Sequence, residues 1–255
     1  MILVKNILTF ILGIGMLNIT QTQYSSVASG VYSWPSQNIN SDEIILVGET
    51  TDLKELKIFG KTILTGKSYV VNEDELDYET LLIFKKGKSK LSFGNDEKVL
   101  DPGSISIIYA GEKYQIENVG NDNAEYYLFN YKSIDPINKE RGNEDGGSFV
   151  VDWNDVEFTQ HDKGGVRQYC EKATEMLKYF SLHVTTLNPG INSHEPHTHT
   201  CDEMVIMIEG STEMQIGNEH FNGNDGDVYF LGANIPHAIN NVGKESCMYY
   251  AFHCE

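Results

Sequence analysis

Residues 190–210 read GINSHEPHTHTCDEMVIMIEG, and residues 226–241 read GDVYFLGANIPHAINN. Each stretch carries a short apolar run, at 204–208 and at 228–231, close to Gly, Asn or Asp. Turn residues of this kind recur roughly every eight to twelve positions along the chain, which is typical of an all-β sandwich or barrel. The sequence therefore predicts an all-β fold with little helix.

The same pattern occurs twice in the chain. Residues 185–254 overlay residues 62–131 without a gap, and fifteen of these seventy positions are identical. About four or five identities are expected by chance. Most of the shared residues are turn residues or aromatics: Gly210 with Gly87, Gly217 with Gly94, Gly226 with Gly103, Asn241 with Asn118, Gly243 with Gly120, Tyr249 with Tyr126, and Tyr250 with Tyr127. We therefore expect an internal duplication, with one module at 30–131, a polar linker at 132–149, and a second module at 150–255.

The charge of the chain limits its partners. The 255 residues include 19 Lys and Arg against 37 Asp and Glu, a formal net charge of −18. Nucleic acids and anionic lipid surfaces are bound by basic patches, so the composition argues against both. Hydrophobic residues make up 40% of the chain, which is enough for a packed core and excludes a disordered protein.

The first residues have the pattern of a secretory signal peptide. An apolar run at 7–19 follows Lys5, and no acidic residue occurs before Asp42. The run is too short and too rich in Gly for a membrane span of about 20 residues. We expect a signal peptide at 1–22, cleaved near Thr20 or after Ala28, and a secreted or periplasmic protein with no membrane partner after cleavage. An uncleaved N-terminal anchor is the alternative.

Four cysteines permit a disulfide in an exported protein. They are Cys170, Cys201, Cys247 and Cys254. Cys247 and Cys254 are separated by an odd number of positions, so on one strand they face opposite sides and cannot pair. We expect mostly free, buried thiols.

A cluster of histidines lies in the first quoted segment. His197 and His199 are two positions apart, so on a strand both imidazoles point to the same face. Glu203 follows after a tight connection, and His237 comes later, directly after Pro236. Three neutral imidazoles and one carboxylate suit one divalent transition metal, Mn(II), Fe(II), Co(II), Ni(II) or Zn(II), whereas Ca(II) and Mg(II) prefer all-oxygen sites. A surface histidine cluster without a metal is the alternative.

Two spaced motifs in these segments resemble those of the cupin superfamily. The first consists of Gly190, six residues, His197-Thr-His199, three residues, Glu203, six residues and Gly210, and the second runs from Gly226 through His237 to Asn241. One extra residue precedes the first His, and Gly232 stands where the family often has Pro, but neither departure affects a ligand. The resemblance covers about residues 60–255. It implies a bicupin: two tandem double-stranded β-helix, or jelly-roll, barrels, with His197, His199, Glu203 and His237 binding one metal ion.

The first module lacks these ligands. In the overlay, His197, His199, Glu203 and His237 fall on Asp74, Leu76, Thr80 and Tyr114, and no His occurs before His161. We therefore predict a structural first barrel and one metal ion per chain. An organic ligand bound without a metal in the first barrel is the alternative.

Three further residues are candidates for a substrate site. His194 is near enough to His197 to donate to a substrate or to act as acid or base, although a solvent-facing position fits equally well. Met207 lies four positions beyond Glu203, on the same face of a predicted strand, and a core position is the alternative. Arg167 has the fork geometry to bind a substrate carboxylate, or it forms a surface salt bridge.

The resemblance implies the scaffold more closely than the reaction, because one fold hosts many activities. We expect an exported metalloenzyme that acts on a small polar oxygenated metabolite as a dioxygenase, isomerase or decarboxylase, since the barrel is too narrow for a macromolecule. A non-catalytic cupin that binds a metal or a small ligand is the alternative. A hydrolase similar to ureidoglycine aminohydrolases is a lesser alternative, because the order of the ligands here differs from theirs. Cupins often pair through sheet edges, so a homodimer is also compatible with the resemblance.

Overall fold

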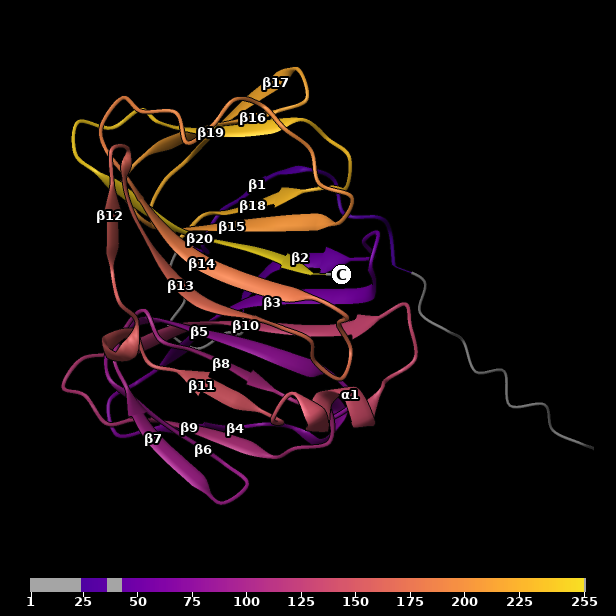
Figure 1. Cartoon of the computed structure of the whole chain (residues 1–255). Helices are drawn as coiled ribbons and strands as arrows, with labels where there is room; N and C mark the ends of the chain where they lie inside the picture. Colours follow the sequence, from indigo (N-terminus) through magenta and orange to yellow (C-terminus); the bar gives the residue numbers. More distant parts are fainter. Residues whose placement is uncertain (1–23, 36–42, 255) are drawn as a thin grey trace, which may run out of the picture.

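Two β-barrels, one above the other in Figure 1, make up most of the computed structural model, which describes residues 24–35 and 43–254. The two tandem jelly-roll barrels confirm the predicted fold class. The predicted signal peptide at 1–22 lies outside the described residues. Within the described ranges, no helix combines the length and the apolar character needed to cross a bilayer.

The first barrel is built from two antiparallel sheets. Its strands are β2 (Glu43–Gly48), β3 (Leu53–Ile63), β4 (Ser68–Val70), β5 (Glu79–Lys86), β6 (Ser89–Phe93), β7 (Asp96–Leu100), β8 (Ile105–Ile108), β9 (Tyr114–Asn118), β10 (Ala124–Ser133) and β11 (Phe149–Val151), with one 3₁₀ turn, η1 (Glu73–Glu75). The larger sheet has the order β11-β8-β5-β10-β3-β2, and the smaller has the order β4-β9-β6-β7.

The second barrel repeats this plan. Its strands are β1 (Gly30–Tyr32), β12 (Thr159–His161), β13 (Gly164–Lys172), β14 (Phe180–Leu187), β15 (Asp202–Glu209), β16 (Thr212–Ile216), β17 (Glu219–Gly223), β18 (Val228–Leu231), β19 (His237–Asn241) and β20 (Cys247–Cys254), with one 3₁₀ turn, η2 (Trp153–Asp155). The larger sheet has the order β1-β18-β15-β20-β14-β13-β12, and the smaller has the order β17-β16-β19. Apart from the extra edge strand β12, the strands β1-β18-β15-β20-β14-β13 of this sheet correspond in order to β11-β8-β5-β10-β3-β2 of the first barrel.

Two short strands cross between the barrels, and their placement differs from the predicted module ranges. Strand β1 precedes the first barrel in sequence but pairs with β18 of the second barrel. Strand β11, at the start of the second module, pairs with β8 of the first barrel. Each strand satisfies the backbone groups at an edge that is otherwise open. The two modules therefore exchange one strand each, in addition to packing against each other.

The linker segment contains one short helix, α1 (Lys139–Glu144). Asn138 caps it, because its side chain accepts a hydrogen bond from the backbone N–H of Arg141 at 3.0 Å. The Arg141 guanidinium donates to the carbonyl oxygens of Thr174 and Glu175 at 2.7 and 3.0 Å. These bonds fasten the linker to the second barrel.

The large sheets are buried on both faces, which explains why the runs at 204–208 and 228–231 do not alternate between apolar and polar residues. One apolar core lies inside each barrel, and a third lies between the two large sheets. In that third core the rings of Phe129 and Phe252 meet edge to face, with centroids 5.6 Å apart. Burial of one such side chain contributes about 1.5–3 kcal/mol, so the packed sheets bind the barrels firmly together.

None of the four cysteines, all of which lie in the described ranges, forms a disulfide. Cys201, Cys247 and Cys254 are buried, and Cys170 is partly exposed. Cys247 and Cys254 lie at the two ends of β20, which agrees with the expectation that they cannot pair.

Candidate metal centre

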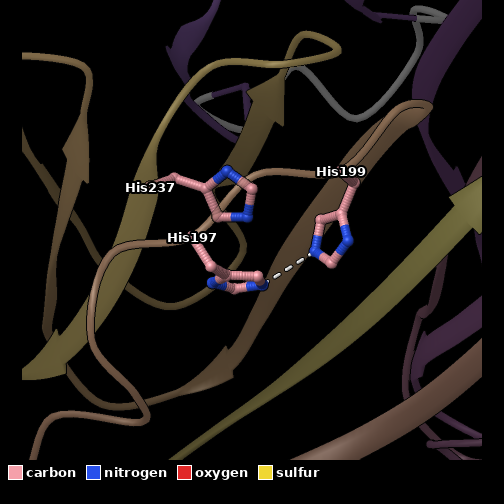
Figure 2. A group of neighbouring side chains, drawn as sticks. All are labelled: His197, His199 and His237. Atoms are coloured by element: carbon pink, nitrogen blue, oxygen red, sulfur yellow. Dashed lines mark hydrogen bonds between the residues drawn. The ribbon is translucent and has the colours of Figure 1, made fainter.

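Backbone hydrogen bonds bring the histidine segment against the start of β19. The N–H of His197 donates to the carbonyl of His237 at 3.1 Å, and the N–H of His237 donates to the carbonyl of His197 at 3.0 Å. The carbonyl of His199 accepts from the N–H of Asn234 at 2.7 Å. His197 and His199 thus lie in a connection rather than in a regular strand as predicted, yet both rings reach the same site as His237 (Figure 2).

The imidazole nitrogens and one carboxylate converge inside the second barrel. Nε2 of His197 lies 2.9 Å from Nε2 of His199 (Figure 2). Oε2 of Glu203 lies 3.3 Å from Nε2 of His199 and 2.8 Å from Nε2 of His237. Two overlapping triads have all their ligand atoms within 4.8 Å of one another: His197, His199 and His237, and His199, Glu203 and His253. The sequence-predicted ligands are therefore neighbours in space.

The buried polar atoms of this cluster fit a cation. Nδ1 of His237 lies 2.9 Å from the carbonyl oxygen of Ile235, so in a neutral ring this nitrogen carries the proton and donates it. Nε2 then offers a lone pair to Oε2 of Glu203, which is also an acceptor, and neither atom makes a hydrogen bond within the described chain. An unsatisfied buried polar group costs about 1–3 kcal/mol. A divalent transition metal would satisfy both atoms, and a backbone carbonyl on the other ring nitrogen is typical of a metal-ligating imidazole.

The electrostatics of the cluster also suit metal ligands. Burial and the charges of three neighbouring histidines lower the pKa of His197 to about 4. Burial acts to raise the pKa of Glu203, but the imidazoles of His199, His237 and His253 close to its carboxylate outweigh burial and hold that pKa well below the usual range. Burial acts to lower the pKa of His237, but the negative charge of the nearby Glu203 carboxylate outweighs burial and raises that pKa. The site thus concentrates one carboxylate charge among imidazoles, the ligand set that binding of a divalent ion requires.

The cluster forms one wall of a cavity of about 410 Å³. Seven of the eight histidines of the chain line this cavity, and the eighth, His220, instead contacts Glu213 at 3.1 Å. His194 is among the lining residues, with its ring centroid 4.0 Å from that of His197, in keeping with its place as a candidate substrate contact. Among the described residues that line the cavity, Glu203 is the only acidic one, although the chain has a net charge of −18. The volume is that of a site for a small molecule.

The other two candidate substrate residues do not line this cavity. Met207 shares the inward face of its strand, but it lies deeper, in the core, where its sulfur accepts a hydrogen bond from the hydroxyl of Thr212 at 3.2 Å. The guanidinium of Arg167 stacks on Trp153, 4.5 Å from the ring centroid, and donates to the carbonyl of Val156 at 2.5 Å. Both residues stabilise the fold rather than contact the site.

His253 belongs to this cluster, although the sequence analysis did not select it. It lies directly opposite Glu203 on the neighbouring strand, and its Nε2 is 3.5 Å from Oε1 of that carboxylate. Tyr249, Ala251 and His253 alternate along β20 and all line the cavity. A period of two on the last strand was therefore the signal available in the sequence.

The corresponding positions of the first barrel hold a different set of side chains. The hydroxyl of Thr80 donates to Oδ1 of Asn130 at 2.9 Å across β5 and β10. Tyr114 is buried at the start of β9, and Asp74 is exposed in the turn η1. Leu76 ends that turn. These residues offer no set of imidazole ligands.

Comparison with known proteins agrees with this architecture. Residues 183–253 match the family model described as Cupin domain. No curated protein matches the chain in sequence.

Solved structures share the fold along most of the chain. AerE from Microcystis aeruginosa is 12% identical, with 88% of this chain and 98% of that chain covered and a TM-score of 0.66. A cupin 2 conserved barrel domain protein from Leptotrichia buccalis is 16% identical, with 87% and 92% covered and a TM-score of 0.56. Oxalate decarboxylase from Bacillus subtilis, in a study of its Mn(II) centres, is 12% identical, with 91% and 78% covered and a TM-score of 0.63. At these identities the likeness is one of fold.

Proposed function

We propose that this chain binds one divalent transition metal ion in its second barrel, where residues 183–253 match the cupin domain model, through His197, His199, Glu203 and His237. The observation that carries the proposal is the contact of two buried acceptors, Nε2 of His237 and Oε2 of Glu203, neither of which has a hydrogen-bond partner among the described residues. The matching positions of the first barrel offer no such ligands. The proposal is therefore one ion per chain.

We further propose that the chain is an enzyme that acts on a small polar oxygenated metabolite. A bound divalent ion supplies a Lewis acid for a substrate oxygen that gains negative charge. The residues of the chain decide what reaches that position: apolar side chains such as Leu231 and Ile239 line part of the cavity, and Lys163 is its one lysine. His194 lines the cavity as well and is suited to accept or donate a proton.

Dioxygenation, isomerisation and decarboxylation are the reaction classes proposed for this site. The structural neighbour named oxalate decarboxylase, with its Mn(II) centres, makes Mn(II) the first ion and small carboxylic acids the first substrates to test. The chain is only 12% identical to that protein, so the choice sets the order of the tests and not their outcome.

The test is metal-dependent turnover. Protein treated with a chelator would be reloaded with Mn(II), Fe(II), Co(II), Ni(II) or Zn(II) and assayed with keto acids, sugars, uronates and small dicarboxylates, with and without O2. We expect turnover with one ion, loss of turnover in His237→Ala, and unchanged turnover in His220→Ala, whose histidine lies outside the cavity. A metal that raises the melting temperature without any turnover would support instead the non-catalytic alternative, a cupin that binds a small ligand or a metal.

We also infer that the two barrels derive from one duplicated module. The support is the constant sequence shift together with equivalent register: Thr80 pairs with Ile108 in the first barrel, and Glu203 pairs with Leu231 in the second. Subtracting 123 from each number of the second pair gives the first pair. Loss or gain of the ligands after duplication would account for a single metal site.

A further inference from the structure

One histidine outside the proposed ligand set faces the carboxylate of the site. His253 and Glu203 are direct partners in the antiparallel pair β20 and β15. Directly opposite residues of such a pair project to the same face, and here both side chains line the cavity. The side chain of His253 is 20% exposed and that of Glu203 is 10% exposed, so water competes little for their contact.

The two oxygens of Glu203 have different neighbours. Oε2 faces the imidazoles of His237 and His199, at 2.8 and 3.3 Å. Oε1 faces Nε2 of His253 at 3.5 Å. Nε2 of His253 is buried and makes no standard hydrogen bond in the described part of the chain. This distance is at the outer limit of a hydrogen bond, and a small rotation of either side chain shortens it.

We propose that His253 is a positioning residue that binds Oε1 of Glu203 and leaves only Oε2 to bind the metal. This inference rests on the proposed metal site. A carboxylate that binds through one oxygen occupies one coordination position, whereas a chelating carboxylate occupies two. His253 thereby keeps one more position open for a substrate oxygen.

The first barrel shows that the fold accommodates a polar pair at this place. There, Thr80 and Asn130 occupy the register positions of Glu203 and His253 and are hydrogen bonded at 2.9 Å. An Asn at position 253 therefore has a precedent within the same chain. Asn also offers an N–H donor, so it is the conservative replacement for the test.

The test compares Co(II)-loaded wild type with His253→Asn, His253→Leu and the control His220→Asn. The absorption bands of Co(II) report its coordination number, and equilibrium titration reports affinity and ions per chain. We expect the wild-type spectrum in His253→Asn and His220→Asn. In His253→Leu we expect about one ion per chain, a changed spectrum, and an affinity lower by about 10–100-fold, as is typical when a partner of a metal ligand is removed.

Three results would contradict the inference. An unchanged Co(II) spectrum in His253→Leu would show that His253 does not position Glu203. Loss of the ion in His253→Asn to the same extent as in His199→Ala would show that His253 is itself a ligand, as the triad with His199 and Glu203 allows. If the wild type bound no Co(II), the proposed function would fail as well. A second apolar variant, His253→Val, replaces His253→Leu if the latter does not fold by circular dichroism.

Discussion

Nε2 of His237 lies 2.8 Å from Oε2 of Glu203. Nδ1 of the same ring faces the carbonyl of Ile235, so in the neutral form both atoms of the short contact are acceptors. Two acceptors at this distance repel unless a positive charge lies at them. A proton or a metal cation supplies that charge, and the nearby imidazoles of His197 and His199 favour the cation.

Replacement of His237 by Ala should abolish tight metal binding. The variant loses one ligand and leaves Oε2 of Glu203 buried without its nearest imidazole. In the wild type, a free ion concentration 100 times Kd adds about 2.7 kcal/mol to the free energy of unfolding. We expect this gain to disappear in His237→Ala and to persist in His220→Ala, as measured by urea unfolding with and without the ion. The same gain in both variants would remove His237 from the site.

Local spacing in the sequence brings out His197, His199 and Glu203, and the resemblance to the two cupin motifs adds His237 to the proposed ligands. Alternation along β20 could have placed His253 on the inward face, but its pairing with Glu203 on the neighbouring strand could not be predicted from the spacing of residues. Met207 was placed on the correct face, but alternation does not tell how deep in the barrel a side chain lies. The sequence likewise did not predict that β1 and β11 pair with strands of the other barrel, because the pattern of residues within a strand does not identify the strand that pairs with it.

Stability should depend on pH through Glu79, which lies between the barrels. Burial raises its pKa from 4.5 to about 7, although bonds from Thr174, Tyr131 and the N–H of Met176 oppose this. Between these values the folded chain binds a proton that the unfolded chain has lost, so the free energy of unfolding falls as the pH rises from about 4.5 to 7. The full effect is roughly 3 kcal/mol, because one pKa unit corresponds to about 1.36 kcal/mol.

Urea unfolding at pH 5 and pH 8 measures this effect. We expect Glu79→Gln to remove the part of the pH dependence that Glu79 contributes, because the amide does not titrate, and to keep the opposite contribution of buried histidines such as His197. Glu140→Gln, at an exposed position of α1, is the matched control and should keep the wild-type difference. An equal pH dependence in all three proteins would show that Glu79 is not the group responsible.

Two tyrosines make equivalent hydrogen bonds between the barrels. Tyr127 donates to the carbonyl of Gly226, and Tyr250 donates to that of Gly103, both at 2.7 Å. The carbonyl of Gly103 also accepts from Tyr169 at 2.8 Å. We therefore expect Tyr127→Phe to cost about 1–2 kcal/mol and Tyr250→Phe less, since only the former leaves a carbonyl with no side-chain donor in the described part of the chain. Chemical denaturation of both variants checks this order, and equal or reversed losses would contradict it.

The position of the mature N-terminus is a further prediction. The N–H of Val27 donates to the carbonyl of Glu49, and the N–H of Glu49 donates to the carbonyl of Ser25, both at 2.9 Å. Cleavage after Ala28 would remove both bonds, so we expect an exported protein cleaved near Thr20. N-terminal sequencing of the protein from the extracellular or periplasmic fraction tests this. An intact Met1 in the cytoplasmic fraction would contradict both the export and the cleavage.

Elemental analysis of the purified protein, by mass spectrometry after metal loading and desalting, tests the central claim most directly. We predict about one divalent transition metal ion per chain, lost in Glu203→Ala and His197→Ala and kept in Thr80→Ala, which changes the matching position of the first barrel. Two ions per chain, or one ion that persists when Glu203 and His197 are both replaced, would contradict a single site in the second barrel.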